Sequence, residues 1–229
     1  HADSMKIYTF NINTDSVYRK VHCFKHTKVF RNDVQAICDS LVYNTKDSCM
    51  TMYKDPIAWN TDRQILGEVI KVYLQDSTVR ETHVIGQALS IELMPDKKHY
   101  NQLSSKEITT YFVKGNVRRV VASGNVKTIY YPVDDKDSTL QGLVYTETDT
   151  MKLYISPERK LQKIWTPKNE SVMYPMTQIP PNKYKLPEFA WFDNLRPTGP
   201  ADVFLWRGKG DDNKLKPLGR KKAPLQHID

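Results

Sequence analysis

Apolar and polar residues alternate most clearly over residues 66–91 and just beyond. Polar residues at positions 75–77 and a glycine at Gly86 interrupt the alternation. A period of two, broken by turn residues, is typical of antiparallel strands with one covered face. We therefore expect nearly all regular structure to be strand, with at most short helical turns near residues 94–106 or 167–195. The apolar positions of these runs are Ile70, Val72, Leu74, Leu89, Ile91 and Leu93.

The same short unit recurs along the chain, each time ending in a tyrosine that is followed by a polar turn. The five tyrosines are separated by 35, 30, 38 and 34 residues. A near-constant spacing of this size indicates stacked supersecondary units. The alternative is a non-repetitive β-sandwich. The five positions are Tyr8, Tyr43, Tyr73, Tyr111 and Tyr145.

Glycine–asparagine pairs indicate where the later strands turn. Gly115-Asn116 and Gly124-Asn125 separate apolar runs at residues 108–113, 117–122 and 126–131. Both residue types tolerate positive φ, so each pair predicts a hairpin turn. Residues 94–104 are polar and predict a loop or lid.

The composition changes after residue 166. Seven prolines between residues 167 and 200 exclude a regular ladder there, because proline lacks the amide donor. The same segment is rich in aromatic residues, unlike a disordered tail. We expect a β-domain over residues 1–166, an ordered Pro- and aromatic-rich extension over 167–207 packed on it, and a basic polar tail over 208–229. Residues 173–206 are expected to cover the C-terminal end of the sheet.

A net charge of +8 allows an anionic partner, and it fits a solubilising surface equally well. No apolar run approaches the roughly 20 residues that span a membrane. The first residues lack a basic stretch followed by an apolar one, so no signal peptide is recognised. Because the sequence begins within a repeat, we expect it to be a mature fragment of a longer precursor.

Candidate metal and catalytic groups are weak. His22 and His26 would stand about 13 Å apart on one strand face, too far for one zinc ion, and Cys23 would point the other way. Cys38 and Cys49 are expected to stay apart, so no disulfide is predicted. No phosphate-binding loop, dinucleotide motif or nucleophile elbow is present. An acidic cluster, best interpreted as a solvated loop, comprises Asp134, Asp135 and Asp137. We expect neither an enzyme nor a cofactor.

Basic and aromatic residues interleave near the end of the β-domain. Such a strand face can stack bases, although exposed lysines and arginines also occur on ordinary strands. A nucleic-acid-binding β-domain is therefore one alternative, but no nucleic acid is expected as the main partner. The residues are Lys152, Tyr154, Arg159, Lys160 and Lys163.

The apolar faces of the five units are the remaining candidate site. A two-sheet jelly roll built from them either fills its centre or leaves a trough for an apolar ligand. The proposed inward-facing residues are Ile70, Val72, Leu74, Leu89, Ile91, Ile108, Phe112, Leu153 and Ile155.

Four stretches resemble a known family. Residues 38–60, 67–92, 115–132 and 173–181 are similar to the OstA-like proteins of Bacteroidetes-type bacteria, in the superfamily of the lipopolysaccharide-transport protein LptA and the N-terminal domain of LptD. The resemblance covers roughly residues 2–197. It implies a V-shaped β-jelly roll, open at both ends, in the periplasm. The long C-terminal segment, residues 167–229, distinguishes this chain from the short bridge protein of that family.

The resemblance also implies a function. It implies that an apolar groove carries the acyl chains of lipopolysaccharide or lipid A during outer-membrane assembly, without catalysis and without a metal. The alternative is a structural or protein-interaction β-module of the cell envelope.

The N-terminal edge strand is apolar and poorly guarded. An open edge can add a strand from another protein, so other envelope transport proteins or a second copy of the chain are expected partners. The contact residues would be Met5, Ile7 and Tyr8.

Overall fold

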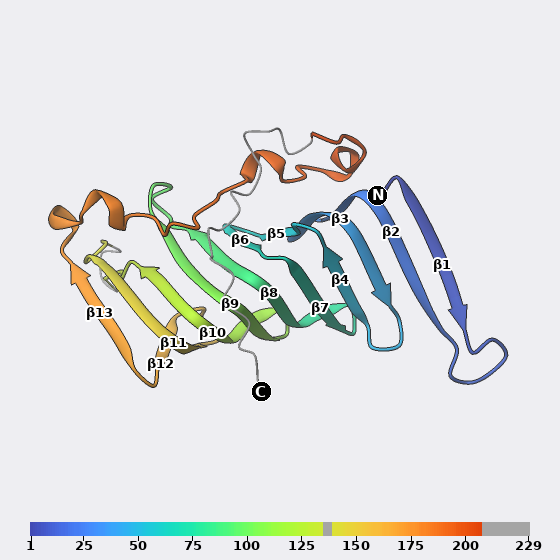
Figure 1. Cartoon of the computed structure of the whole chain (residues 1–229), viewed down its shortest axis with the longest axis horizontal. Helices are drawn as coiled ribbons and strands as arrows, with labels where there is room; N and C mark the ends of the chain where they lie inside the picture. Colours follow the sequence, from blue (N-terminus) through green and yellow to red (C-terminus); the bar gives the residue numbers. More distant parts are fainter. Residues whose placement is uncertain (135–138, 208–229) are drawn as a thin grey trace, which may run out of the picture.

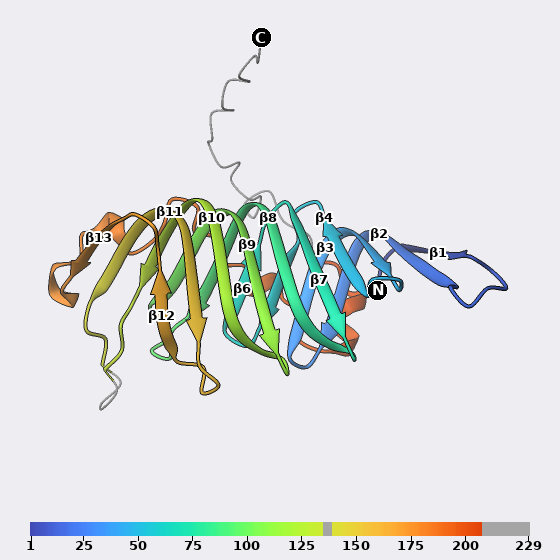
Figure 2. The same ribbon diagram turned by 90° about the horizontal axis from the view of Figure 1, so that it is seen from below.

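The computed structural model describes residues 1–134 and 139–207. Thirteen strands form one antiparallel sheet that extends along the length of the molecule (Figures 1 and 2). The helical segments in these ranges are short 3-10 turns, and none of them has the length and apolar character of a membrane span. The all-β class is confirmed, as an open β-jelly roll. The tail proposed at 208–229 lies outside the described residues.

The strands are β1 (Ser4–Phe10), β2 (Tyr18–Arg31), β3 (Val34–Asn44), β4 (Cys49–Tyr53), β5 (Ile57–Asn60), β6 (Arg63–Leu66), β7 (Val69–Gln75), β8 (Thr78–Leu93), β9 (Tyr100–Val113), β10 (Asn116–Tyr130), β11 (Leu143–Ile155), β12 (Leu161–Trp165) and β13 (Asn169–Tyr174). The 3-10 turns are η1 (Met176–Gln178), η2 (Pro181–Lys183), η3 (Asp193–Leu195) and η4 (Pro200–Phe204). The sheet order is β1-β2-β3-β4-β7-β8-β9-β10-β11-β12, with β5 beside β3 and β6, β6 also beside β8, and β13 beside β11.

A line of backbone irregularities folds this sheet in two. Two consecutive residues of positive φ occur in β2, between β4 and β5, in β8 and in β10. In β2, β8 and β10 the ladder shifts register at this point, and at the remaining position β4 ends before β5 begins. Bulges of this kind bend a strand and increase its twist. The pairs are Lys25-His26, Lys54-Asp55, Gly86-Gln87 and Gly124-Asn125.

The fold line divides the sheet into two halves. The open half contains β1, β4, β7, β12 and the parts of the longer strands paired with them. The strap half contains β5, β6, β13 and the remaining parts. Gly124-Asn125 is therefore a bulge within β10 rather than the expected hairpin turn, and β9 begins at Tyr100, inside the expected loop. The expectation of no ladder after residue 166 was wrong, because β13 pairs with β11 in the proline-free stretch before Pro175.

Glycine at position 124 is required by this bend. Its φ is +80°, and a methyl group there would come within 2.6 Å of Lys106 Cδ. Gly124→Ala is expected to destabilise the fold by about 1–2 kcal/mol, the cost of a left-handed alanine, plus the cost of moving Lys106. Urea denaturation measures the change.

Two matched variants separate these contributions. Gly115→Ala has a similar φ of +74° with no atom within 4 Å, so it reports the backbone cost alone. Gly199→Ala has extended backbone and open space, so no measurable loss is expected. Equal stability of all three variants would contradict this account of the bend.

Buried apolar residues form three clusters. The first joins the inner faces of both halves, with small residues such as Ala36, Ala58 and Ala88 from the strap half against larger ones such as Leu41 and Met52 from the open half. The other two lie between the outer face of the strap half and the chain after β13. The strap half is therefore buried on both of its faces.

We call residues 175–206 the C-terminal strap. Figure 1 shows it crossing the strap half from β13 back toward β2, over strands from distant parts of the sequence. Phe192 and Leu195 pack against Trp59 and Leu89. The strap thus lies over an outer face instead of covering the C-terminal end alone, where β12 and β13 remain largely exposed.

Buried glutamines hold the strap to the sheet. The Gln64 side chain accepts a hydrogen bond from the Phe192 amide at 2.8 Å and donates one to the Ala190 carbonyl at 2.7 Å. Gln102 contacts Leu186 N and Tyr184 O in the same way, at 2.8 and 2.9 Å. Each of these two glutamine side chains therefore donates one hydrogen bond to the strap backbone and accepts one from it, as a neighbouring strand would. Gln35 accepts a hydrogen bond from Arg196 at 2.8 Å.

The far end of the strap is fixed at β2. The buried Lys28 Nζ donates to the Asp202 carbonyl at 3.1 Å and to the Leu205 carbonyl, and burial lowers the Lys28 pKa. The Thr198 amide donates to the Asp202 carboxylate at 2.8 Å and is the main reason that the Asp202 pKa is lowered. Arg207 pairs with the same carboxylate at 2.6 Å.

Candidate functional site

The inner face of the open half carries two apolar rows that run across the sheet. Residues in each row are cross-strand partners, so strand register alone brings them together. The first row, from β1 to β11, is Met5, Cys23, Leu41, Met52, Ile70, Val84, Ile108, Ala122 and Met151. The second row, from β1 to β12, is Ile7, Val21, Tyr43, Met50, Val72, Thr82, Thr110, Val120, Leu153 and Ile164.

Exposure rises toward both ends of the second row but only toward β1 in the first row, because Met151 at the other end of the first row is 3% exposed. In the first row Ile70 and Ile108 are 0% and 2% exposed, so the region beside the fold line is packed core. At the N-terminal end Ile7 is 66% exposed, and at the C-terminal end Ile164 is 49% exposed. The second row therefore reaches solvent at both ends of the molecule, whereas the first row is exposed only at Met5.

The inner face of the strap half carries a polar rim at the strand ends away from the fold line, formed by Arg63, Glu92 and Asn101. Arg63 pairs with Glu92 at 2.9 Å, and Asn101 donates to the other oxygen of Glu92 at 3.4 Å. Burial, and then the charge of Glu92, raise the pKa of Tyr130. Cross-strand pairing sets Arg63, Glu92 and Asn101 on the same face as Ile65, Ser90 and Leu103, which is the inner face. The two halves thus combine an apolar wall with a polar margin, which suits an amphiphile.

Seven of the nine predicted groove residues belong to the open half. Ile70 and Ile108 are in the packed first row, and Val72 and Leu153 are half-buried in the second. Ile155 packs against the same cluster. The two other members lie toward the free strand ends of the open half: Phe112 faces Val117 across the strands, and Leu74 is at the end of β7.

Leu89 and Ile91 do not join them. Both lie in the outer cluster under Phe192 and Leu195, on the face opposite Ala88. Their assignment to the groove was wrong, because the strap covers the outer face of this half. The larger side chains therefore point outward, and small ones such as Ala88 point inward.

The N-terminal edge residues divide between two faces. Met5 and Ile7 continue the inner apolar rows, whereas Tyr8 lies on the outer face beside His22, with ring centroids 5.1 Å apart. All of β1 is exposed. Its free edge and the inner apolar rows therefore meet at one end of the molecule.

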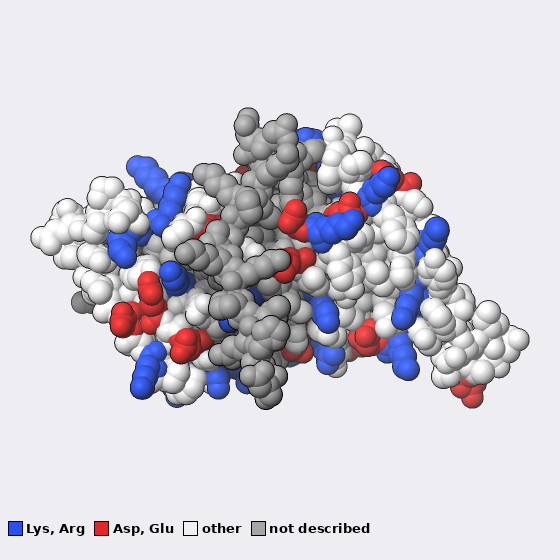
Figure 3. All heavy atoms as spheres, viewed as in Figure 1, with Lys and Arg blue, Asp and Glu red and all other residues white. Residues whose placement is uncertain are grey.

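The basic–aromatic candidates occupy the outer face of the open half. Tyr154 and Lys163 are cross-strand partners, and Lys152 lies 4.5 Å from the ring centre of Trp165. Arg159 and Lys160 belong instead to the turn before β12. Several rings on this face are already covered by neighbouring cations. On the face seen in Figure 3, basic and acidic side chains are interspersed without one dominant patch.

The remaining titratable candidates are separate from one another. His26 pairs with Asp3 at 2.8 Å, while Cys23 is buried in the inner cluster. Cys23, Cys38 and Cys49 are free thiols, and burial raises the pKa of Cys38 to about 12. Within residues 1–134 and 139–207, no three His, Cys, Asp or Glu side chains are grouped to hold a metal. Asp135 and Asp137 lie outside those ranges.

Sequence reasoning missed the polar rim and the glutamine contacts. Arg63 and Glu92 looked like ordinary surface residues, and nothing nearby in the sequence indicated that they pair. The sequence around the glutamines gave no signal either: Gln64 follows Arg63 and precedes Ile65, as a glutamine on an exposed strand face also could.

Comparisons with known proteins give a likeness in fold. No protein-family model matches the sequence, and no curated protein sequence matches it. Among solved structures, the chain is similar to LptH, the LptA-homologous periplasmic component of the lipopolysaccharide transport device of Pseudomonas aeruginosa. The two are 13% identical with a TM-score of 0.47, over 62% of this chain and 95% of LptH.

Proposed function

We propose that this chain is a non-enzymatic, periplasmic lipid-binding module that carries acyl chains of lipopolysaccharide or lipid A in outer-membrane assembly. The observation that supports this most is the second row across the inner face, which is mainly apolar and exposed at both ends. Binding of an acyl chain is favourable in proportion to the apolar area that it removes from water. The polar rim would face the head group.

The burial pattern suggests where an acyl chain lies. The first row is packed and supports the fold, so the lipid would contact the half-buried second row and the inward-facing residues at the free strand ends of the open half. Val72, Phe112, Leu153 and Ile155 are the proposed contacts. Entry at either end would begin on exposed apolar residues, Ile7 or Ile164.

A protein-interaction module of the envelope is the second candidate. The exposed strand β1 supports it, because its seven residues leave one ladder edge open. In this proposal Met5, Ile7 and Tyr8 contact an added strand from another transport protein or a second copy. The two proposals are compatible, since an added strand would extend the inner rows.

Site-specific photo-cross-linking tests the proposed lipid contact. A photoreactive phenylalanine at Phe112 is expected to cross-link to lipopolysaccharide, and the same group at Tyr111 is expected to give none. The two positions are neighbours on β9 and point to opposite faces, since Tyr111 contacts Arg119 on the outer face. Mass spectrometry identifies the attached lipid.

Two outcomes would contradict lipid carriage. Equal cross-linking from both positions would indicate adsorption to the whole surface. No cross-link from either, together with concentration-dependent association in sedimentation experiments, would favour the protein-interaction module. Binding of single-stranded nucleic acid with a steep salt dependence would favour the basic–aromatic face instead.

A further inference from the structure

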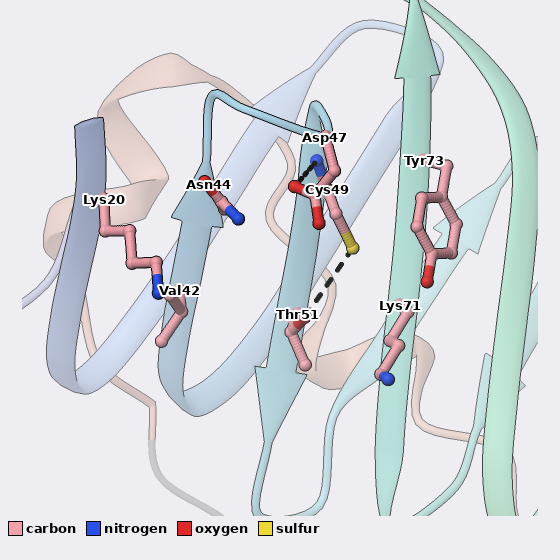
Figure 4. Close-up of a pocket in the computed structure, with 8 residues that line it drawn as sticks. All are labelled: Lys20, Val42, Asn44, Asp47, Cys49, Thr51, Lys71 and Tyr73. Atoms are coloured by element: carbon pink, nitrogen blue, oxygen red, sulfur yellow. Dashed lines mark hydrogen bonds between the residues drawn. The ribbon is translucent and has the colours of Figure 1, made fainter. Parts of the chain in front are cut away.

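A pocket of about 180 Å³ lies on the outer face of the open half, where β2, β3, β4 and β7 are side by side (Figure 4). The register explains the hollow. Lys20 is opposite Asn44, Asn44 is opposite Cys49, and Cys49 is opposite Tyr73. Short side chains on β3 and β4 therefore form a floor between longer ones on β2 and β7.

Two ammonium groups border this floor. Figure 4 shows Lys20 on one side and Lys71 on the other, with Thr51 between them. Within the described part of the chain, neither lysine has a carboxylate within ion-pair distance, and Lys20 lies 5.5 Å from the ring centre of Phe10. Both are only partly exposed. Their charges are therefore held near the pocket without a counter-ion from residues 1–134 or 139–207.

The other polar groups are mostly able to donate hydrogen bonds. The Asn44 amide and the Thr51 and Tyr73 hydroxyls line the pocket. Asp47 is the one lining carboxylate, and its Oδ1 accepts a hydrogen bond from the Cys49 amide at 3.2 Å. The lining thus combines two positive charges with one negative charge, that of Asp47.

We infer that this pocket binds a terminal phosphate group. A phosphomonoester carries a charge of about −1.5 to −2 and strong acceptor oxygens, which match two ammonium groups and several neutral donors. Charge-assisted hydrogen bonds are the stronger kind. The group could belong to a lipid head group or to a soluble sugar phosphate. The pocket faces away from the apolar rows, so it stands independently of the proposed lipid carriage.

Titration with inorganic phosphate at constant ionic strength, followed by amide NMR, tests the site. Saturable shifts are expected around Cys49 and Thr51. Lys20→Gln and Lys71→Gln are each expected to weaken binding about tenfold, the loss of one charge-assisted hydrogen bond. Asp47→Asn keeps the acceptor for the Cys49 amide, removes a repelling charge and is expected to tighten binding.

Lys168→Gln is the matched control, because it removes an exposed lysine next to β13, at the other end of the sheet. It is expected to leave phosphate binding unchanged. Unchanged melting temperatures establish that the variants fold. Phosphate binding that ignores Lys20 and Lys71, or that falls equally in Lys168→Gln, would overturn the assignment.

Two further probes identify the source of the phosphate. Phosphatidylcholine vesicles with and without phosphatidic acid test a lipid head group, and glucose 6-phosphate tests a soluble sugar phosphate. Dependence of either on Lys71 supports the site and names its ligand class. Failure of inorganic phosphate and of both probes to bind would overturn the proposal.

Discussion

Replacing Gln64 by leucine is expected to release the C-terminal strap. Gln64 is fully buried, and leucine would leave the Phe192 amide, the Ala190 carbonyl and the Trp59 indole N–H without their partner. A buried polar group left unpaired costs about 1–3 kcal/mol. With three such groups and partial relaxation, we expect a loss of about 3–5 kcal/mol.

Limited trypsin digestion and urea denaturation measure this effect. Lys183 and Lys185 lie within the strap, and the bonds after them should become cleavable before those of the sheet. Gln75→Leu, at the exposed end of β7, makes the same chemical change without buried partners and should stay within about 0.5 kcal/mol of the parent. A strap that stays protected in Gln64→Leu would show that apolar packing alone holds it.

Replacing Ile108 by aspartate is expected to unfold the domain, whereas Phe112→Asp should fold and lose lipid. Ile108 is 2% exposed between Val84 and Ala122, so a carboxylate there would be buried without a partner. Such changes belong to the most destabilising class, at about 4–5 kcal/mol or more. Phe112 is half-buried and next to the exposed end of β9, where a charge can reach water.

Circular dichroism and lipopolysaccharide cross-linking distinguish these outcomes. Tyr111→Asp, on the opposite face of the same strand, is expected to fold and retain lipid. Phe112→Asp protein that is folded and binds lipid normally would refute a lipid contact at Phe112. A folded Ile108→Asp protein would show that the first row lines an open space, as the sequence alone allowed.

The pattern along the open half could be interpreted without a structure. Its strands are covered on one face, so the alternation of Ile70 and Val72 with polar neighbours indicates directly which side is buried. The sequence indicated only some of the positive-φ positions. Gly124-Asn125 looked like a hairpin turn, and Lys25-His26 carried no turn signal, because the same local conformation serves a hairpin and a bulge.

The sequence by itself determined the all-β class, the recurring strand units and the apolar rows of the open half, because side-chain alternation is a local property of an extended chain. Only the tertiary structure decided which way the strap half faces. There both faces are buried, and the choice depends on contacts between distant residues, such as Gln64 with Phe192, 128 positions apart. Leu89 points outward because the strap covers it, and the sequence near Leu89 does not predict this contact.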